Sequence, residues 1–225
     1  MPTDLARKAT AEAVGTALLV AVVVGSGIFA ERLSPEDTGL QLLENSLATA
    51  GGLLALILAF GAVSGAHFNP VVSLAVRFFG DLTTRELAAY IPAQIVGGCI
   101  GAIVANLMFD LDAVTLSTHA RSSSGLWLSE IVATFGLVLV ILSVVRSGKS
   151  AAAPFAVAGY IAAAYWFTSS TSFANPAVTI GRTLSDTFAG IKPSSAPAFI
   201  AAQLVGGVVA FMLVRFLYPH KEVAL

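Results

Sequence analysis

Two short segments place an asparagine next to a proline close to long apolar stretches: Asn69-Pro70-Val71 and Asn175-Pro176-Ala177. An asparagine amide donates and accepts hydrogen bonds, so each side chain could donate to the oxygen of a passing water or hydroxyl group and orient it. Water oriented in this way cannot relay a proton along a chain. An unsatisfied polar group at membrane depth is costly, so each asparagine must line a wet passage or be buried in protein. The two matching interruptions therefore predict a pore.

Each asparagine–proline pair also has the features of a helix start. Proline at the first helical position loses no hydrogen bond, and asparagine is a favoured N-cap. The segments that follow, as far as Arg77 and Arg182, are too short to cross a membrane. If these half-helices enter from opposite faces, their positive dipole ends meet at the centre and repel cations. The alternative is that Asn69 and Asn175 only cap their helices.

The composition indicates an integral membrane protein. Of 225 residues, 56% are hydrophobic and 11% are charged, whereas a soluble domain carries about 25% charged residues. A net charge of −1 gives no sign of a nucleic-acid partner. Six apolar runs are long enough to span a membrane: Ala9 to Ala30, Leu42 to Ala62, Leu87 to Phe109, Leu126 to Val145, Ala151 to Phe167 and Ala196 to Tyr218.

Basic residues favour alternate loops. One set of loops and termini holds Arg7, Lys8, Arg77, Arg85, Arg146, Lys149, Arg215 and Lys221, while the opposite loops are richer in acidic residues. Because cytoplasmic loops carry the excess of Lys and Arg, we expect both termini to be cytoplasmic.

An internal repeat organises the chain. Glu12 near the start of the first run recurs as Glu130 in the fourth, the asparagine–proline pair recurs, and Ala93-Gln94-Ile95-Val96-Gly97-Gly98 recurs as Ala202-Gln203-Leu204-Val205-Gly206-Gly207. Each half has three spans, so the second half crosses the membrane in the opposite sense. We expect one domain, residues 1–225, built from inverted repeats at about 9–110 and 126–218, with its site near the membrane midplane.

Taken together, these motifs resemble the aquaporin (major intrinsic protein) family over nearly the whole chain. The resemblance implies an all-α membrane fold with six transmembrane helices in a right-handed bundle, two re-entrant half-helices, a pore in each subunit and a homotetramer. It also implies that Glu12 and Glu130 are buried acceptors that brace the re-entrant loops from behind, and that His67 either lies beside the pore or braces its loop. A carboxylate within a span must in any case find donors in protein or water. The valine at Val71, where the family usually has alanine, should affect packing or the local bore.

The chain departs from the family pattern at its selectivity filter. Most water- and glycerol-conducting members have an arginine directly after the second motif, and here that residue is Val178. Loss of a guanidinium removes a positive charge and five donors, which predicts a wider, less polar and less cation-repelling filter. The resemblance places the other filter positions at Thr49, Ser172 and Ala163. If Trp166 faces the lumen in place of Ala163, the pore would be narrow.

Arg182 follows Val178 by four residues and should lie on the same helix face, one turn further from the centre. We expect it to place a displaced positive charge in the outer vestibule. The alternative is a salt bridge to Asp186, which again lies four residues further along.

The leading hypothesis is a passive channel for small uncharged solutes: glycerol-like polyols, urea, undissociated metalloid acids such as arsenite, and water. The approach to the second motif, residues 163–172, and Val178 are similar to bacterial channels associated with arsenic resistance, which implies a multi-pass protein of the inner (plasma) membrane. The alternatives are a water-selective channel with an atypical filter, an ion-coupled secondary transporter, which also uses inverted repeats, and a structural protein with an occluded pore.

We expect no enzymatic activity and no cofactor or metal, because His67, His119 and His220 are scattered and no nucleophile is paired with a base. The expected partners are small neutral solutes, water, membrane lipid and further copies of the chain, and no nucleic acid.

Overall fold

The computed structural model describes residues 4–219, and within that range it contains six helices that are long and apolar enough to cross a membrane. They are α1 (Asp4–Leu33), α2 (Thr38–Ser64), α4 (Thr84–Met108), α5 (Ser124–Arg146), α6 (Ala153–Phe167) and α8 (Ala196–Leu217), and short 3-10 turns extend the last two spans to Ser150–Phe167 and Pro193–Leu217. Each corresponds to one predicted span, so the six-helix prediction is confirmed. Lys221, part of the predicted basic side, and His220 lie outside the described residues.

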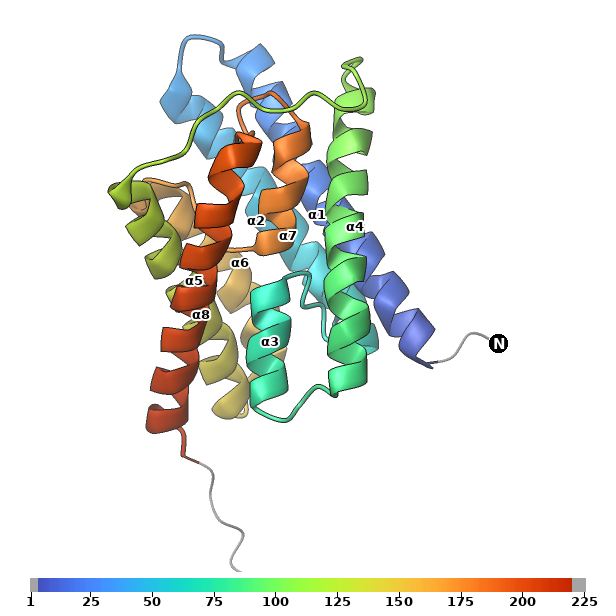
Figure 1. Ribbon diagram of the computed structural model, residues 1–225, viewed down its shortest axis with the longest axis vertical. Helices are drawn as coiled ribbons and strands as arrows, with labels where there is room; N and C mark the ends of the chain where they lie inside the picture. Colours follow the sequence, from blue (N-terminus) through green and yellow to red (C-terminus); the bar gives the residue numbers. More distant parts are fainter. Residues whose placement is uncertain (1–3, 220–225) are drawn as a thin grey trace, which may run out of the picture.

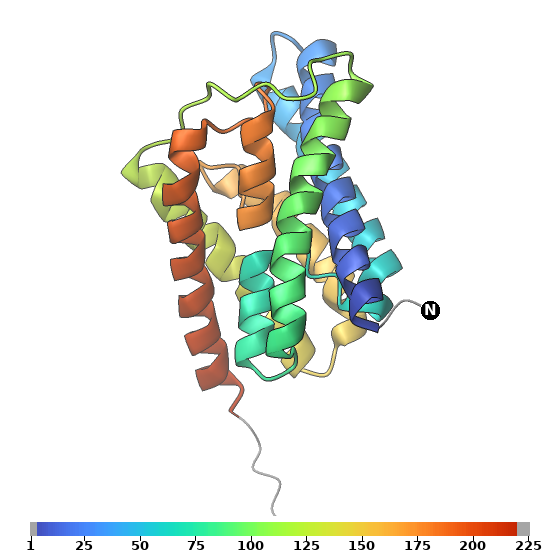
Figure 2. The same ribbon diagram turned by 45° about the vertical axis from the view of Figure 1, so that its right-hand side comes forward.

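Each half of the fold also contains one short helix: α3 (Pro70–Phe78) in the first half and α7 (Pro176–Gly181) in the second. Both begin at the proline that follows the asparagine. The Asn69 Oδ1 accepts a hydrogen bond from Val71 N at 2.9 Å, and the Asn175 Oδ1 accepts one from Ala177 N at 3.0 Å. Figure 1 and Figure 2 show α3 and α7 one above the other, with their N-terminal ends facing each other near the middle of the bundle. The predicted re-entrant half-helices and their caps are confirmed.

Glycine lets the first and third helices of each half approach closely, α1 against α4 and α5 against α8. A Cβ atom at Gly97 or Gly101 of α4 would collide with backbone carbonyl oxygens of α1, and one at Gly206 of α8 would collide with the Ile131 carbonyl of α5. Small residues at such contacts are typical of membrane helices. In α8, Gly207 leaves space for the buried Val71 side chain at the start of α3. The valine of the first motif is therefore a packing residue.

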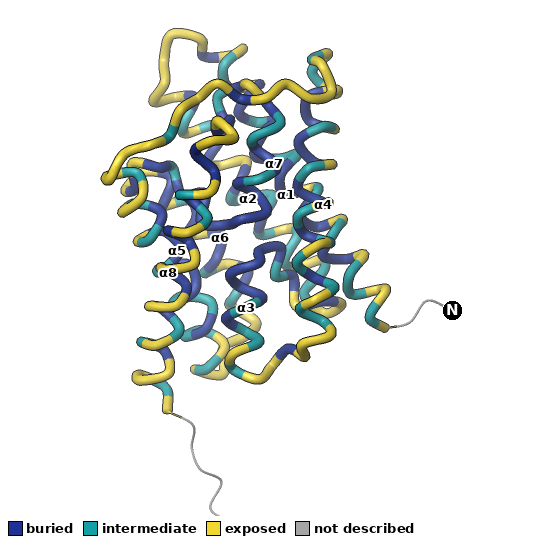
Figure 3. Tube along the Cα trace, viewed as in Figure 1, coloured by how far each residue is buried: buried dark blue, intermediate teal, exposed yellow. Residues whose placement is uncertain are grey.

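The buried residues lie along the inner faces of the long helices and over most of α3 and α7, as Figure 3 shows. Large apolar side chains such as Leu128, Met212 and Phe216 are exposed on the outside. An apolar exterior around a polar-containing interior is the pattern expected of a protein whose outer surface meets lipid.

Candidate functional site

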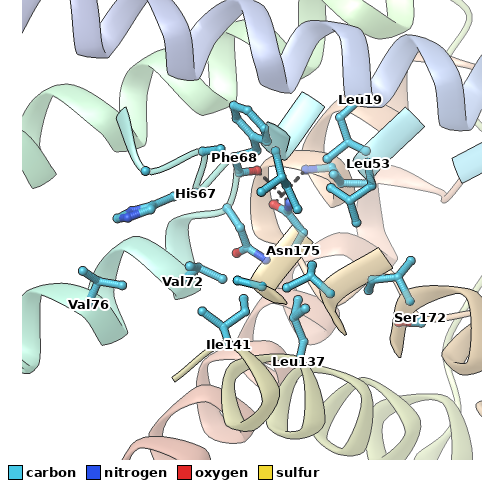
Figure 4. A pocket seen from close by; sticks show the side chains of 18 of the residues that line it. Leu19, Leu53, His67, Phe68, Val72, Val76, Leu137, Ile141, Ser172 and Asn175 are labelled. Atoms are coloured by element: carbon cyan, nitrogen blue, oxygen red, sulfur yellow. Dashed lines mark hydrogen bonds between the residues drawn. The ribbon is translucent and has the colours of Figure 1, made fainter. Parts of the chain in front are cut away.

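A cavity of about 320 Å³ lies beside the tips of α3 and α7 and is lined by both halves of the chain. Its wall is mainly apolar: in Figure 4 the side chains of Leu19, Leu53, Val72, Leu137 and Ile141 surround the space next to Asn175. The lining extends from Asp81 and Arg146 at one end to Arg182 at the other. The cavity therefore follows the long direction of the bundle.

The two motif asparagines line this cavity and also tie the two loops together. The Asn69 amide Nδ2 donates to the Ala174 carbonyl oxygen at 2.7 Å, and the Asn175 Nδ2 donates to the Phe68 carbonyl oxygen at 2.8 Å. Each amide nitrogen carries two hydrogens, so one hydrogen on each remains for an oxygen atom in the cavity. Capping and donation into the cavity are therefore compatible roles.

A buried carboxylate holds the first loop. Glu12 of α1 is fully buried, and its Oε1 accepts hydrogen bonds from Ser64 Oγ at 2.6 Å and His67 N at 3.0 Å. Its Oε2 accepts from Phe68 N at 2.7 Å and Gln94 Nε2 at 2.8 Å. Four hydrogen bonds from α2, the loop and α4 thus converge on this one carboxylate.

The second loop has an equivalent carboxylate. Glu130 of α5 is fully buried and accepts from Phe173 N and Ala174 N, each at 2.9 Å, and from Gln203 Nε2 at 2.6 Å. The Gln203 amide also donates to Thr179 Oγ1 of α7 at 2.9 Å. The same set of contacts thus connects α5, the loop, α7 and α8.

The loops carry backbone strain at matching positions. Ala66 and Phe68 have φ of 50° and 50°, and Ser172 and Ala174 have φ of 55° and 48°. A non-glycine residue in this left-handed region costs about 1–3 kcal/mol. The side-chain types at these positions give no signal for positive φ, so the sequence could not indicate this geometry. The hydrogen bonds to Glu12 and Glu130 hold it in place.

Three of the four predicted filter residues, Thr49, Ser172 and Val178, line the cavity. Ala163 does not: it is exposed on the outer face of α6, whereas Ile161 and Tyr165, one turn apart, face inward and line the wall. The Ala163 prediction was wrong, because residues two apart on a helix point in nearly opposite directions.

The alternative prediction, that Trp166 of α6 faces the lumen, was also wrong: the aromatic residue of α6 that lines the cavity is its neighbour Tyr165. Trp166 is 52% exposed, and its Nε1 donates to Ser46 Oγ at 3.2 Å. The neighbouring Tyr165 is buried, lines the cavity, and its hydroxyl forms a hydrogen bond of 3.0 Å with Thr49 Oγ1. The sequence places Tyr165 in a run of alanine and aromatic residues without a polar face, so its orientation could not be inferred.

Arg182 is 2% exposed and lines the cavity near Val178. Its Nε donates to the Ala189 carbonyl oxygen, and its Cζ lies 3.4 Å from the centroid of the Phe173 ring.

The alternative, a salt bridge between Arg182 and Asp186, is not formed. Asp186 instead accepts from Thr118 N at 2.7 Å and Thr118 Oγ1 at 3.0 Å, and the backbone hydrogen bond in particular lowers the pKa of Asp186. The reason is that α7 ends at Gly181 and gives way to a short 3-10 turn at Arg182–Leu184, so a helical spacing of four no longer applies.

A second arginine, which the sequence did not single out, also lies beside Phe173. The Arg121 Cζ is 5.1 Å from the Phe173 ring centroid, and its Nε donates to the Gly190 carbonyl oxygen at 2.9 Å. Arg121 lies in the connection between α4 and α5, where no regular spacing relates it to the second motif. Among the described residues, neither Arg121 nor Arg182 forms a salt bridge.

The opposite end of the cavity has a paired charge. Arg146, at the end of α5, lies 3.8 Å from the Asp81 carboxylate, and its Cζ is 4.3 Å from the Phe79 ring centroid. Both charged residues line the cavity. The two ends of the cavity therefore differ in charge.

Comparisons with known proteins agree with this geometry. The sequence matches the family described as major intrinsic protein over residues 2–168 and 148–224. It is 50% identical to the aquaglyceroporin AqpS of Rhizobium meliloti (strain 1021), an alignment that covers 95% of this chain and 91% of the relative. It is 28% identical to the glycerol uptake facilitator protein of Bacillus subtilis (strain 168), over 88% of this chain and 78% of the relative.

The fold matches a solved structure as well. The X-ray structure of the aquaglyceroporin from Plasmodium falciparum aligns with a TM-score of 0.70 and 21% sequence identity, covering 93% of this chain and 95% of that one. At this identity the likeness concerns the fold alone. The sequence match, the fold and the paired half-helices lead to one conclusion: this chain belongs to the major intrinsic protein family of passive membrane channels, and it is not an enzyme.

Proposed function

We propose that this chain forms a passive channel for small uncharged solutes, namely glycerol-like polyols, undissociated metalloid acids such as arsenite, and water, through a pore within each subunit. The observation that carries the proposal is the cavity beside the two half-helix tips, lined by both motif asparagines and extending to charged residues at both ends. A long passage with few polar groups suits a solute that crosses without being held tightly.

The wall chemistry supports a polyol-like solute. Most of the lining is apolar. Between the charged residues at its two ends, the polar side chains on the wall are His67, the amides of Asn69 and Asn175, and the hydroxyl-bearing Thr49, Tyr165 and Ser172. A polyol presents a carbon backbone to one side and hydroxyl groups to the other, and an apolar site with a few placed polar groups fits such a molecule. Valine at position 178 leaves more room than arginine would. The name of the most similar relative reported above, an aquaglyceroporin, points in the same direction.

A water-selective channel is the second candidate, and one observation favours it. The hydrogen bond between Thr49 and Tyr165 joins α2 and α6 at the cavity wall and places a phenol ring there. If this ring narrows the passage enough, water crosses and glycerol does not. Comparison of water and glycerol flux separates the two candidates.

An ion-coupled transporter fits the contacts less well. Such a mechanism needs an ionisable group near the midplane that can exchange protons or bind a cation. Glu12 and Glu130 are fully buried behind the loops, and neither lines the cavity. Their hydrogen bonds to loop backbone amides support a bracing role for both carboxylates.

We also infer the setting of the channel. The predicted basic residues that the structure describes lie near the N-terminal end of α1 and the C-terminal ends of α3, α5 and α8. These four helix ends lie toward the lower part of Figure 1. This supports cytoplasmic N- and C-termini in the inner (plasma) membrane. We infer a homotetramer in which the apolar outer faces contact lipid and neighbouring subunits.

Stopped-flow measurements on proteoliposomes test the proposal. In gradients of glycerol, urea or undissociated arsenous acid, vesicles with the protein should swell faster than empty vesicles, at rates linear in solute concentration and independent of pH and sodium. Saturation at low concentration, or uptake that follows a proton or sodium gradient, would identify a transporter. The absence of swelling for every solute and for water would identify an occluded, structural protein.

A further inference from the structure

At the outer end of the cavity, Arg182 carries a positive charge, whereas residue 178 is an uncharged valine. Val178 and Arg182 lie one turn apart and both line the cavity. Arg182 is nevertheless 2% exposed, so its charge is held inside the protein and not on the surface. A charge held in such an environment acts strongly on its neighbours because screening by water is weak.

The Arg182 guanidinium keeps most of its donors available. A guanidinium has five N–H donors, and the described contacts use only Nε, on the Ala189 carbonyl oxygen. Neither Nη atom has a hydrogen-bond partner among the described residues, and neither is enclosed away from solvent. Since the residue lines the cavity, these donors are available to an oxygen atom in the passage.

A second unpaired polar group lies on the same cavity. Ser172 is 4% exposed, and its Oγ is buried without a hydrogen-bond partner among the described residues. Ser172 directly precedes Phe173, the ring on which the Arg182 guanidinium rests. Buried polar atoms normally have partners, so this unpaired hydroxyl in the cavity wall becomes a partner for a solute oxygen once its side chain rotates toward the passage.

Phe173 and its surroundings orient Arg182. The ring contacts the Arg182 Cζ at 3.4 Å and the Arg121 Cζ at 5.1 Å. Arg121 is itself held by the carbonyl oxygens of Gly190 and Phe188, at 2.9 Å and 3.4 Å. Neither guanidinium forms a salt bridge within the described residues, and Arg182 is the one of the two that lines the cavity.

We propose that Arg182 is the specificity-determining residue of the outer constriction: from one turn further out, it supplies the guanidinium that residue 178 lacks. Together with Ser172 it binds the oxygen atoms of a neutral, hydroxyl-bearing solute, and its charge excludes cations. This proposal rests on the proposed channel function. It also revises the sequence-based expectation that the filter repels cations less than in relatives with arginine after the second motif.

The test uses three variants of Arg182 in proteoliposomes. Arg182→Gln removes the charge and keeps a donor, Arg182→Lys keeps the charge and loses the planar fork, and Val178→Arg/Arg182→Val moves the guanidinium back by one turn. The matched control is Arg32→Gln, because Arg32 also lies over a phenylalanine, Phe109 at 5.1 Å, and donates to a carbonyl, but it is exposed and not on the cavity. Proton and sodium leak, and the ratio of glycerol to water flux, are measured for each.

We expect Arg182→Gln to raise cation leak by about tenfold or more and to lower the glycerol-to-water ratio. The double variant should restore cation exclusion, and Arg32→Gln should match the wild type in both quantities. Unchanged leak and ratio in Arg182→Gln would overturn the proposal. If Arg182→Gln does not fold, Arg182→Lys decides: retained exclusion with an altered ratio supports the proposal, and an unaltered ratio overturns it. Failure of the wild-type protein to conduct would instead reject the proposed channel function.

Discussion

The two re-entrant loops have the same bracing contacts but carry different side chains, and the difference between His67 and Phe173 sets the character of each mouth. Glu12 holds the backbone amides of His67 and Phe68, and Glu130 holds those of Phe173 and Ala174. His67 and Phe173 are therefore equivalent. The shared contacts build the passage, and the unlike side chains make its two ends different.

In the orientation proposed above, the loop before α3 is the inner loop and the loop before α7 is the outer loop. At the inner loop, His67 Nδ1 forms a hydrogen bond of 3.0 Å with Ser73 Oγ, and the nearby charges of Asp81 and Arg146 are paired. At the outer loop, Thr179 takes the place of Ser73, and the Phe173 ring instead carries two guanidinium groups. We infer that selection among solutes and rejection of cations take place mainly at the outer end.

The largest expected effect comes from breaking the shared brace. Glu12→Gln or Glu130→Gln removes a charged acceptor from two loop amides and leaves them poorly paired in the interior. Hydrogen bonds to charged groups contribute about 1.5–3 kcal/mol each, so we expect the free energy of unfolding to fall by about 3 kcal/mol or more and water flux to be lost. Thermal unfolding and water permeability measure this.

Because the two braces are equivalent, Glu12→Gln and Glu130→Gln should behave alike. If one variant retains wild-type stability and flux, the two halves are not equivalent in energy, and the comparison drawn above does not hold.

An intermediate effect is expected from Val178→Arg, which adds a second guanidinium to the outer end. The larger side chain narrows the passage, so flux of glycerol and arsenous acid should fall by about tenfold, with a smaller loss for water. Solute and water permeabilities are compared in the same vesicles. Equal losses for all solutes, or no loss, would mean that residue 178 does not set the constriction.

The smallest effect is expected from a matched pair of leucine substitutions at the equivalent positions His67 and Phe173. Phe173→Leu removes the ring beneath Arg182, which costs up to about 2 kcal/mol of cation–π contact and lets the guanidinium move, so cation leak should rise a few-fold. His67→Leu, at the inner loop, should leave cation leak unchanged. A larger leak in the His67→Leu protein would place cation rejection at the inner end.

Much of the architecture could be predicted from the sequence, because apolar length determines the spans and Asn-Pro pairs are strong helix starts. The fourth filter residue could not be predicted, since Ala163, Tyr165 and Trp166 lie in a helix with no polar face to set its orientation. The surroundings of Arg182 depend on where α7 ends, and Arg121 reaches Phe173 from a distant loop. Both depend on tertiary contacts that no local spacing records.

The central claim is that solutes pass through the cavity beside the tips of the two half-helices, and one measurement tests it most directly. Leu137 of α5 lines the cavity, and Leu128 of the same helix is exposed on the outside. Glycerol and water permeability of proteoliposomes is measured for the wild type, Leu137→Trp and Leu128→Trp. We predict that Leu137→Trp falls to the level of empty vesicles while Leu128→Trp matches the wild type. Full flux through a correctly folded Leu137→Trp protein would contradict the account.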